Sequence, residues 1–119
     1  MNIKYIIFAI IVVLSIKNIS PAIAVEVSSD IAKNKINNLI YHHIIDTRND
    51  KERETGYHAY SMSISSDNLN SMSDKIKNKY RKLLIISKTG ERASQDAEQV
   101  TSMGYRNVEY LNDVWTRLI

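Results

Sequence analysis

The continuous apolar run Leu83–Ile86 constrains the fold of this chain more than any other sequence feature. A run of this kind fits a strand that is covered on both faces, as strands of parallel sheets are. It leads directly into a polar loop, Ser87–Arg92, and then into a helical pattern over Glu91–Met103 that Gly104 ends. The sequence therefore predicts a strand–loop–helix unit within an α/β domain.

The remaining apolar patterns alternate between strand and helix. Strands are expected at Val25–Val27, Ile44–Asp46, Tyr60–Ser65 and Asn107–Leu111. A helix after Ser28 is expected to bury Ile31, Ile36, Leu39 and Ile40, and one over Asp67–Lys82 is expected to bury Leu69, Met72, Ile76 and Tyr80. A final turn at Asp113–Ile119 is expected to pack back through Trp115 and Leu118. This order predicts about five mostly parallel strands flanked by helices on both faces.

Residues 1–24 have the pattern of a secretory signal peptide. Lys4 supplies the positive start, Tyr5–Ile16 is a twelve-residue apolar run, and Ala22–Ala24 is a small-x-small cleavage site. Twelve helical residues span about 18 Å, which is short of the ~30 Å hydrocarbon core of a membrane. We expect cleavage after residue 24 and export to the periplasm or beyond, which leaves 25–119 as one domain with no stable membrane insertion. An uncleaved anchor is the alternative.

Composition excludes several classes of function. The signal segment contains Lys4 and Lys17 and no acidic residue, so fourteen of the 16 basic residues remain in the domain beside 13 acidic ones. This near balance argues against a nucleic-acid partner, because phosphate binding needs a concentrated basic face. The chain has no cysteine, which excludes disulfides, thiolate metal sites and cysteine nucleophiles.

Two polar groups follow predicted strands, at the edge where ligands of open α/β sheets bind. One is Asp46-Thr47-Arg48, and the other is the loop of Ser87, Lys88, Thr89, Gly90, Glu91 and Arg92. Backbone N–H groups of such a loop can converge on one point, and the N-terminus of the following helix adds a positive dipole. The loop is either a cradle for a small anion, to which Arg92 adds a guanidinium, or an ordinary turn in which Ser87 or Thr89 caps the helix.

Four short motifs occur in a recognisable order. They are Ile45-Asp46-Thr47-Arg48, Glu54-Thr55-Gly56-Tyr57-His58, the strand and loop Leu84–Ser94 with its Ser-x-x-Gly-x-Arg, and Gly104–Leu111, followed by Trp115. Together they resemble rhodanese-like domains, in particular the small exported single-domain members. In that family an apolar strand leads into Cys-x-x-Gly-x-Arg, and the other motifs are Ile-Asp-x-Arg, Glu-x-Gly-His-Ile and Gly-aromatic-x-x-Val-x-x-Leu.

The resemblance implies a rhodanese-like fold and thiosulfate sulfurtransferase chemistry. In that chemistry a cysteine thiolate takes a sulfur atom from a donor such as thiosulfate and passes the resulting persulfide sulfur to cyanide or a thiol. Here Ser87 stands at the cysteine position, and a hydroxyl cannot hold a persulfide. The family histidine falls at Tyr57, one place before His58, and the family Gly-Gly pair falls at Asn112-Asp113.

Other chemistries find little support in the sequence. Serine hydrolysis needs a base beside Ser87, and none of the three histidines has a spacing that places it there. Cysteine-dependent phosphatases have a similar loop with five residues between cysteine and arginine, where this chain has four. His42 and His43 occupy adjacent positions that face opposite sides of a strand, so no metal site is expected.

The sequence thus predicts an exported rhodanese-like protein that is inactive as a thiosulfate sulfurtransferase and binds a small oxyanion or an acidic group of a partner. Asp46 is expected to support the loop through backbone donors, and Arg48 is expected to pair with an acid such as Glu54. Two alternatives stay open: an enzyme that uses a thiol from a partner or small molecule, and a family member that has lost its activity. No cofactor is implied, and the oligomeric state stays open.

Overall fold

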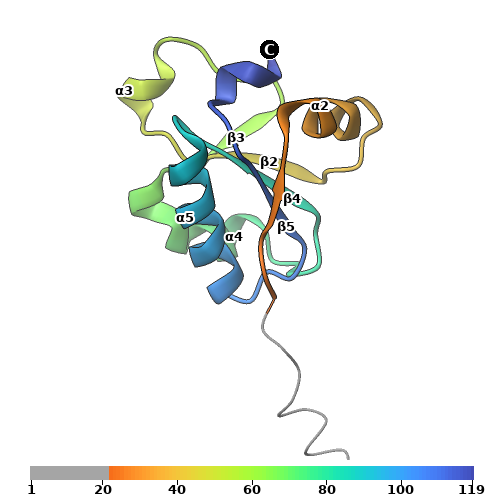
Figure 1. Ribbon diagram of the computed structural model, residues 1–119. Helices are drawn as coiled ribbons and strands as arrows, with labels where there is room; N and C mark the ends of the chain where they lie inside the picture. The colour runs from red at the N-terminus through yellow and green to blue at the C-terminus, as the bar shows by residue number, and fades with distance from the viewer. Residues whose placement is uncertain (1–21) are drawn as a thin grey trace, which may run out of the picture.

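The computed structural model describes residues 22–119, and most of the expected signal peptide, residues 1–21, lies outside the described residues. The domain is built on one five-stranded sheet of order β1-β5-β4-β2-β3, in which every neighbouring pair is parallel (Figure 1). Its strands are β1 (Val25–Val27), β2 (His43–Asp46), β3 (Ser61–Ser63), β4 (Leu83–Ile86) and β5 (Val108–Leu111). The predicted parallel α/β architecture is confirmed.

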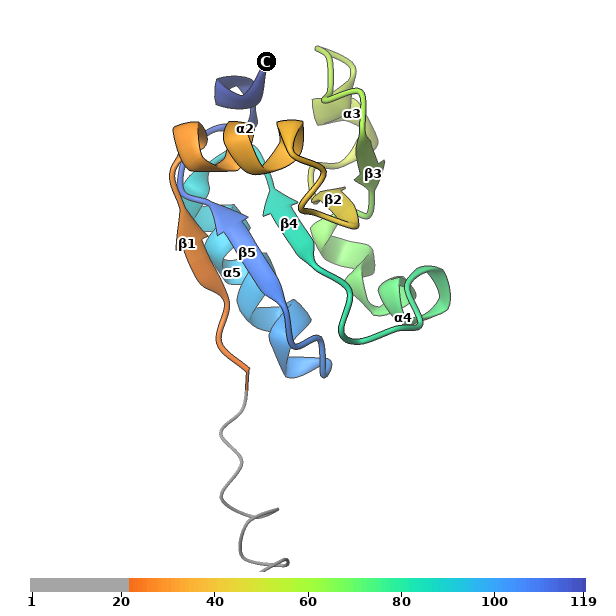
Figure 2. The same ribbon diagram turned by 90° about the vertical axis from the view of Figure 1, so that its right-hand side faces the viewer.

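Helices cover both faces of this sheet. They are α2 (Ser29–Asn37), α3 (Asp50–Arg53), η1 (Ser66–Ser71), α4 (Met72–Lys75), α5 (Gly90–Ser102) and η2 (Trp115–Leu118). Figure 2 shows α2 in front of the sheet and α5 behind it. Each face has its own hydrophobic cluster, one beneath α5, η1 and α4 and one beneath α2 and η2.

Strand β4 lies at the centre of the sheet and supplies both clusters. Leu83 and Ile85 face the cluster under α5, whereas Leu84 and Ile86 face the cluster under α2, and all four are fully buried. Alternation along a strand sends successive side chains to opposite faces, so a strand between two layers has to be apolar throughout. This accounts for the continuous run Leu83–Ile86.

Helix α5 follows the pattern expected from the sequence. Ala93, Ala97 and Val100 are buried against the sheet. The Thr89 side chain caps the helix by accepting a hydrogen bond from the Arg92 N–H at 3.1 Å. After the helix ends, Gly104 has a φ of +101°, a conformation that favours glycine.

A buried carboxylate attaches α2 to the sheet. Glu109 on β5 accepts hydrogen bonds from Lys35 at 2.9 and 3.0 Å and from the Tyr41 hydroxyl at 2.8 Å, and it also pairs with Lys82. Burial alone would raise the pKa of Glu109, but these hydrogen bonds outweigh it and lower that pKa. The carboxylate therefore stays charged at neutral pH.

The expected apolar face after Ser28 is wrong in part. Helix α2 ends at Asn37, so Leu39 and Ile40 lie beyond it, and Leu39 is 88% exposed. Ile31 is also exposed, and the small side chain of Ala32 is the buried contact of the helix. A small residue at the contact lets the helix approach the sheet closely, which leaves the larger side chains at its margins.

The expected helix over Asp67–Lys82 is also wrong in part. Leu69, Met72 and Ile76 are buried as predicted, but they lie on η1, on α4 and at the C-cap of α4. At Ile76 the backbone becomes extended, with φ −126° and ψ 92°, and Tyr80 is left exposed. The chain needs the residues after Ile76 to travel back to the start of β4, which helical spacing cannot reveal.

Leu39 provides a stability test of the turn after α2. Its φ of 57° is unfavourable for a side chain with a Cβ, and its N–H donates to Ile36 in a helix-ending turn. Leu39→Gly is expected to raise the free energy of unfolding by about 1 kcal/mol, since glycine adopts this conformation without strain. Urea denaturation measures the change, with Leu39→Ala as the control that keeps the strain. A less stable glycine variant would show that the leucine side chain makes a stabilising contact.

The expected cleavage point lies immediately before β1. Ala24 is packed against the cluster under α5, and Val25 is the first residue paired with β5. Cleavage after residue 24 would therefore leave all five strands in the domain. Within residues 22–119, the helices are all too short or too polar to cross a bilayer.

Candidate functional site

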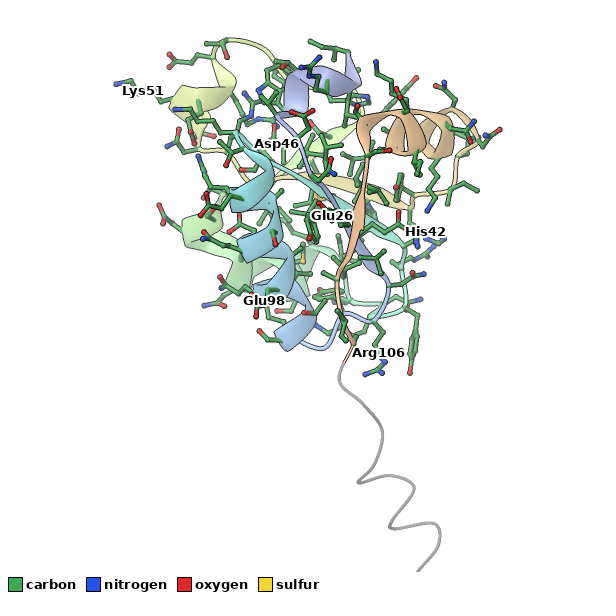
Figure 3. All side chains as sticks on the ribbon, viewed as in Figure 1. Glu26, His42, Asp46, Lys51, Glu98 and Arg106 are labelled. Atoms are coloured by element: carbon green, nitrogen blue, oxygen red, sulfur yellow. The ribbon has the colours of Figure 1, made fainter. Side chains whose placement is uncertain are left out.

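The two polar groups predicted from the sequence meet at the carboxyl edge of the sheet. They follow β2 and β4, which are neighbouring parallel strands. The Thr47 N–H donates to the Ile86 carbonyl at 3.0 Å, which joins the two strand ends. The Trp115 N–H donates to the Ser87 carbonyl at 3.1 Å, so η2 covers the same edge. Figure 3 shows Asp46 in the upper part of the molecule, near the start of α5.

Ser87 lies buried at the beginning of the loop. It is fully inaccessible to solvent, and within residues 22–119 its Oγ is the one buried side-chain nitrogen or oxygen that lacks a hydrogen-bond partner. Thr89, and not Ser87, caps α5. Buried polar atoms are nearly always paired, so an unpaired hydroxyl below a helix N-terminus calls for an explanation other than capping.

Gly90 is required by a close backbone approach. A Cβ at this position would lie 2.4 Å from the carbonyl carbon of Asn112 and 2.9 Å from the Asp113 nitrogen. No side chain fits there unless the backbone moves. The segment 112–113, where the family has Gly-Gly, therefore packs directly on the loop and sets its position.

Asp46 and Arg48 form a buried ion pair beneath the site. The Arg48 Nη2 donates to Asp46 Oδ2 at 2.8 Å, and the Arg48 N–H donates to Asp46 Oδ1 at 3.1 Å. Arg53 also donates to Asp46 Oδ2, at 2.7 Å. Arg48 thus pairs with an acidic residue, but with Asp46 and not with Glu54, and the backbone N–H that donates to Asp46 belongs to Arg48 and not to the loop. Asp46 is the nearer partner for Arg48 because its carboxylate lies two residues away in the sequence and is equally buried.

The guanidinium of Arg48 connects several segments of this edge. Its Nη1 donates to the Glu52 carbonyl at 3.0 Å and its Nη2 donates to the Gly56 carbonyl at 2.9 Å. Its Cζ lies 3.9 Å from the centroid of the Trp115 ring. Arg48 is only 1% exposed, and these contacts satisfy a cation that could not otherwise be buried. Through these partners Arg48 links the end of β2 to α3, to Gly56 and to Trp115.

Arg92 is engaged by a carboxylate from another part of the chain. Its Nη1 donates to Glu52 Oε2 at 2.7 Å, and Glu52 Oε1 accepts from the Asn49 N–H at 3.0 Å in a capping box of α3. The hydrogen bond from Arg92 is the main effect that holds the pKa of Glu52 below its ordinary value. Glu52 raises the pKa of Arg92 in return. The negatively charged carboxylate of Glu52 therefore lies beside the Ser87–Arg92 loop.

The sequence did not indicate Glu52 and Arg53 as members of the site. The spacing Asn49-x-x-Glu52 is that of a capping box, and it could have predicted the start of α3. It carries no information about Arg92, which lies forty residues further on. Glu52 reaches Arg92 and Arg53 reaches Asp46 because α3 follows β2 at the carboxyl edge of the sheet.

The contacts of His42 and His58 are with residues outside the Ser87–Arg92 loop. His58 is buried, and its Nδ1 accepts a hydrogen bond from the Tyr60 N–H at 3.2 Å, while burial lowers its pKa. Tyr57, at the family histidine position, is exposed and lies under the Arg53 guanidinium. His42 Nδ1 accepts from the Lys82 N–H at 2.8 Å, at the opposite edge of the sheet. None of these contacts gives Ser87 a base.

Comparison with known proteins identifies the family. Residues 26–117 match the Rhodanese-like domain family. No curated protein shows significant similarity to the chain.

Solved structures of low sequence identity share the fold. The rhodanese-like domain of an Anabaena protein superposes with a TM-score of 0.69 at 17% identity and covers 84% of this chain and 74% of its own. A protein of unknown function from Rhodopseudomonas palustris, described as a possible tyrosine phosphatase, gives 0.72 at 17%, with 80% and 79% covered. A rhodanese from E. coli solved with anions gives 0.58 at 18%, with 63% and 88% covered. With the family match over nearly the whole described domain, this chain belongs to the rhodanese-like domain family.

Proposed function

We propose that this protein is an exported rhodanese-like binding module whose loop holds a small oxyanion or an acidic group of a partner, and that it does not act as a thiosulfate sulfurtransferase. The observation that carries the proposal is Ser87, a buried hydroxyl without a hydrogen-bond partner at the position of the family cysteine. The chain contains no cysteine that could replace it.

The loop geometry supports anion binding. The N-terminus of α5, a helix of 13 residues, begins three residues after Ser87 and directs its first N–H groups toward this edge. The helix dipole and these donors favour negative charge. An E. coli rhodanese of the same fold was solved with anions, which is consistent with this use of the fold.

Glu52 is the internal competitor for such an anion. It occupies one guanidinium nitrogen of Arg92 and repels a second negative charge. Because Arg92 is about one-third exposed, the pair is open to solvent and to an incoming ligand. A bound anion would therefore either share Arg92 with Glu52 or displace Glu52 from it. The strength of the Arg92–Glu52 pair thus determines the affinity for the anion.

A titration with sulfate tests the proposal by measuring the melting temperature. Wild-type protein is expected to show a saturable rise, because a ligand that binds only the native state stabilises it. In Arg92→Gln this saturable part is expected to disappear. In Glu52→Gln, which keeps the capping box, the midpoint is expected to fall about fivefold in sulfate concentration, because a repelling charge is removed.

Sulfate also stabilises proteins in general by its exclusion from their surfaces, so the comparison between variants is decisive. Lys33→Gln on α2 is the matched control, since it removes one exposed cation from the face of the sheet opposite α5. The same sulfate response in wild type and Arg92→Gln would rule out a binding module. The remaining interpretation would then be a family member that has lost its activity.

A thiol supplied from outside is the enzyme alternative. Turnover of thiosulfate that requires an added thiol and is lost in Arg92→Gln would support it over the binding module. Export is likewise a proposal, which rests on the pattern of residues 1–24 and on the position of the expected cleavage point directly before β1. Mass measurement of the N-terminus of the mature protein decides it.

A further inference from the structure

The edge of the sheet opposite the Ser87–Arg92 loop carries a dense group of cations. The segment 75–82, which connects α4 to β4, contains five basic residues and no acidic one. They are Lys75, Lys77, Lys79, Arg81 and Lys82. More than a third of the fourteen basic residues between positions 25 and 119 therefore fall within eight positions. The nearly neutral net charge of the domain conceals this concentration.

The parallel topology brings a further cation to the same edge. Because all five strands run in one direction, the residues that precede each strand share one edge of the sheet. Arg106 precedes β5, its N–H donates to the Lys79 carbonyl at 2.9 Å, and it lies at the lower end of the molecule in Figure 3. The exposed cations of this surface, which we call the basic edge, are Lys75, Lys77, Arg81 and Arg106. Asp74 is an acidic residue beside them.

Lys82 and Lys79 anchor this segment to the rest of the domain. Lys82 pairs with the buried carboxylate of Glu109, and the Lys79 Nζ lies 4.0 Å from the centroid of the Tyr105 ring. These contacts hold the connection between α4 and β4 against the sheet. The exposed cations of the segment, which are Lys75, Lys77 and Arg81, therefore face solvent from a stretch of chain that is fixed to the sheet.

Exposed apolar side chains accompany the cations. Tyr80 is 72% exposed in the middle of the basic segment. Ile23, which precedes the expected cleavage point and so belongs only to the uncleaved chain, is 80% exposed. Tyrosine has an apolar ring and a polar hydroxyl, a combination that favours the headgroup region of a membrane. Lysine and arginine beside such residues are typical of surfaces that lie on a bilayer.

The chain enters the domain at this same edge. The coloured chain that leads from residue 22 into β1 lies at the lower end of the domain in Figures 1 and 2. Five residues, 17–21, separate it from the apolar run Tyr5–Ile16. At about 3.5 Å per extended residue they reach no more than roughly 20 Å. When that run enters a bilayer during export, the basic edge is thus held within reach of the lipid headgroups.

We propose that the basic edge is a membrane-facing surface that binds anionic phospholipid headgroups. Lysines and arginines near an anionic leaflet each add to binding, and a polybasic patch acts together with an apolar anchor while the two are joined. The orientation follows from the sheet, because the Ser87–Arg92 loop lies at the opposite edge and would face away from the bilayer toward soluble ligands. This inference rests on the proposed export and not on the proposed anion binding, and vesicle binding by residues 22–119 is measured separately from both.

Vesicle sedimentation of residues 22–119 tests this surface without the preceding apolar run. All five strands and both hydrophobic clusters lie within these residues, and circular dichroism checks that each variant is folded. The vesicles are phosphatidylcholine alone or phosphatidylcholine with roughly one third phosphatidylglycerol, as an anionic surface. The test variant is Lys77→Gln/Arg81→Gln. The matched control, Lys33→Gln/Lys51→Gln, removes the same charge from exposed positions on α2 and α3.

We expect wild-type protein to bind the anionic vesicles and not the neutral ones. We also expect it to dissociate from the anionic vesicles as the salt concentration is raised. The test variant is expected to bind about 25-fold more weakly, at about fivefold per cation, while the control stays within about twofold. Equal loss in both variants would show a net-charge effect and overturn the proposal. So would binding to DNA or polyglutamate without binding to vesicles, which would assign the edge to an acidic macromolecule.

Discussion

Ser87→Cys is expected to convert a protein that forms no thiocyanate from thiosulfate and cyanide into one that does. A cysteine thiol has a pKa of about 8.5 when free, and a position before a helix N-terminus lowers it. The thiolate would break the sulfur–sulfur bond of thiosulfate, release sulfite and hold the persulfide that cyanide then attacks. The serine hydroxyl cannot perform the first step, so turnover is expected to rise by at least about tenfold over background.

Ser87→Ala is the matched control for this conversion, because it fills nearly the same space without a nucleophile. It is expected to stay at the uncatalysed rate, as wild-type protein does. Intact-mass measurement after exposure to thiosulfate should find one added sulfur atom on the cysteine variant alone. Thiocyanate formation by wild-type protein, or a sulfur adduct on it without an added thiol, would contradict the assignment of Ser87 as the inactivating residue.

Failure of the cysteine variant would also be informative. Glu52 on α3 already pairs with Arg92, and under the proposed binding mode a bound thiosulfate would need that guanidinium. If Ser87→Cys is folded and inactive, Ser87→Cys/Glu52→Gln tests whether the carboxylate is the obstacle. Recovery in the double variant would indicate that the loop is intact but occupied by Glu52.

Arg48→Leu is expected to lower the free energy of unfolding by about 3–5 kcal/mol, the largest stability change we anticipate. The substitution leaves the fully buried carboxylate of Asp46 without its most deeply buried cation and leaves two carbonyls without their donor. Removing one member of a buried ion pair costs this much because the remaining charge stays out of water. Arg53 still contacts Asp46, which favours the lower part of the range. Urea denaturation at neutral pH measures the loss.

Arg53→Leu separates the two cations around Asp46. Its side chain is 13% exposed, compared with 1% for Arg48, so solvent can compensate for part of its loss. We expect a smaller effect, about 1–2 kcal/mol. In the Arg48→Leu background, Asp46→Asn is expected to restore part of the stability by removing the buried charge. A loss below about 1 kcal/mol for Arg48→Leu would contradict the role of the pair in supporting the site.

Elements whose burial follows directly from their own residues were predicted correctly. The run Leu83–Ile86 forms the central strand, and Ala93, Ala97 and Val100 face the core from α5. Predictions failed where helical spacing continued beyond a helix end. Leu39 follows the C-cap of α2, and Tyr80 lies in the return segment to β4, so both are exposed. The spacing of apolar residues predicts which side chains share a helix face as long as the helix continues. Where the helix ends is decided by the need to connect it to the next strand.

The amino-acid sequence by itself determined the family resemblance, the alternation of strands and helices, and the absence of any cysteine that could carry sulfur. These properties are local, because each depends on residue type and on neighbours within one element. Tertiary structure alone decided that Glu52 pairs with Arg92, that Arg48 pairs with Asp46 beneath Trp115, and that the cations before β4 and β5 share one edge. Side chains forty residues apart in the sequence come into contact only because parallel strands place their carboxyl ends at one edge of the sheet. The residues near each of these side chains do not specify such a long-range contact.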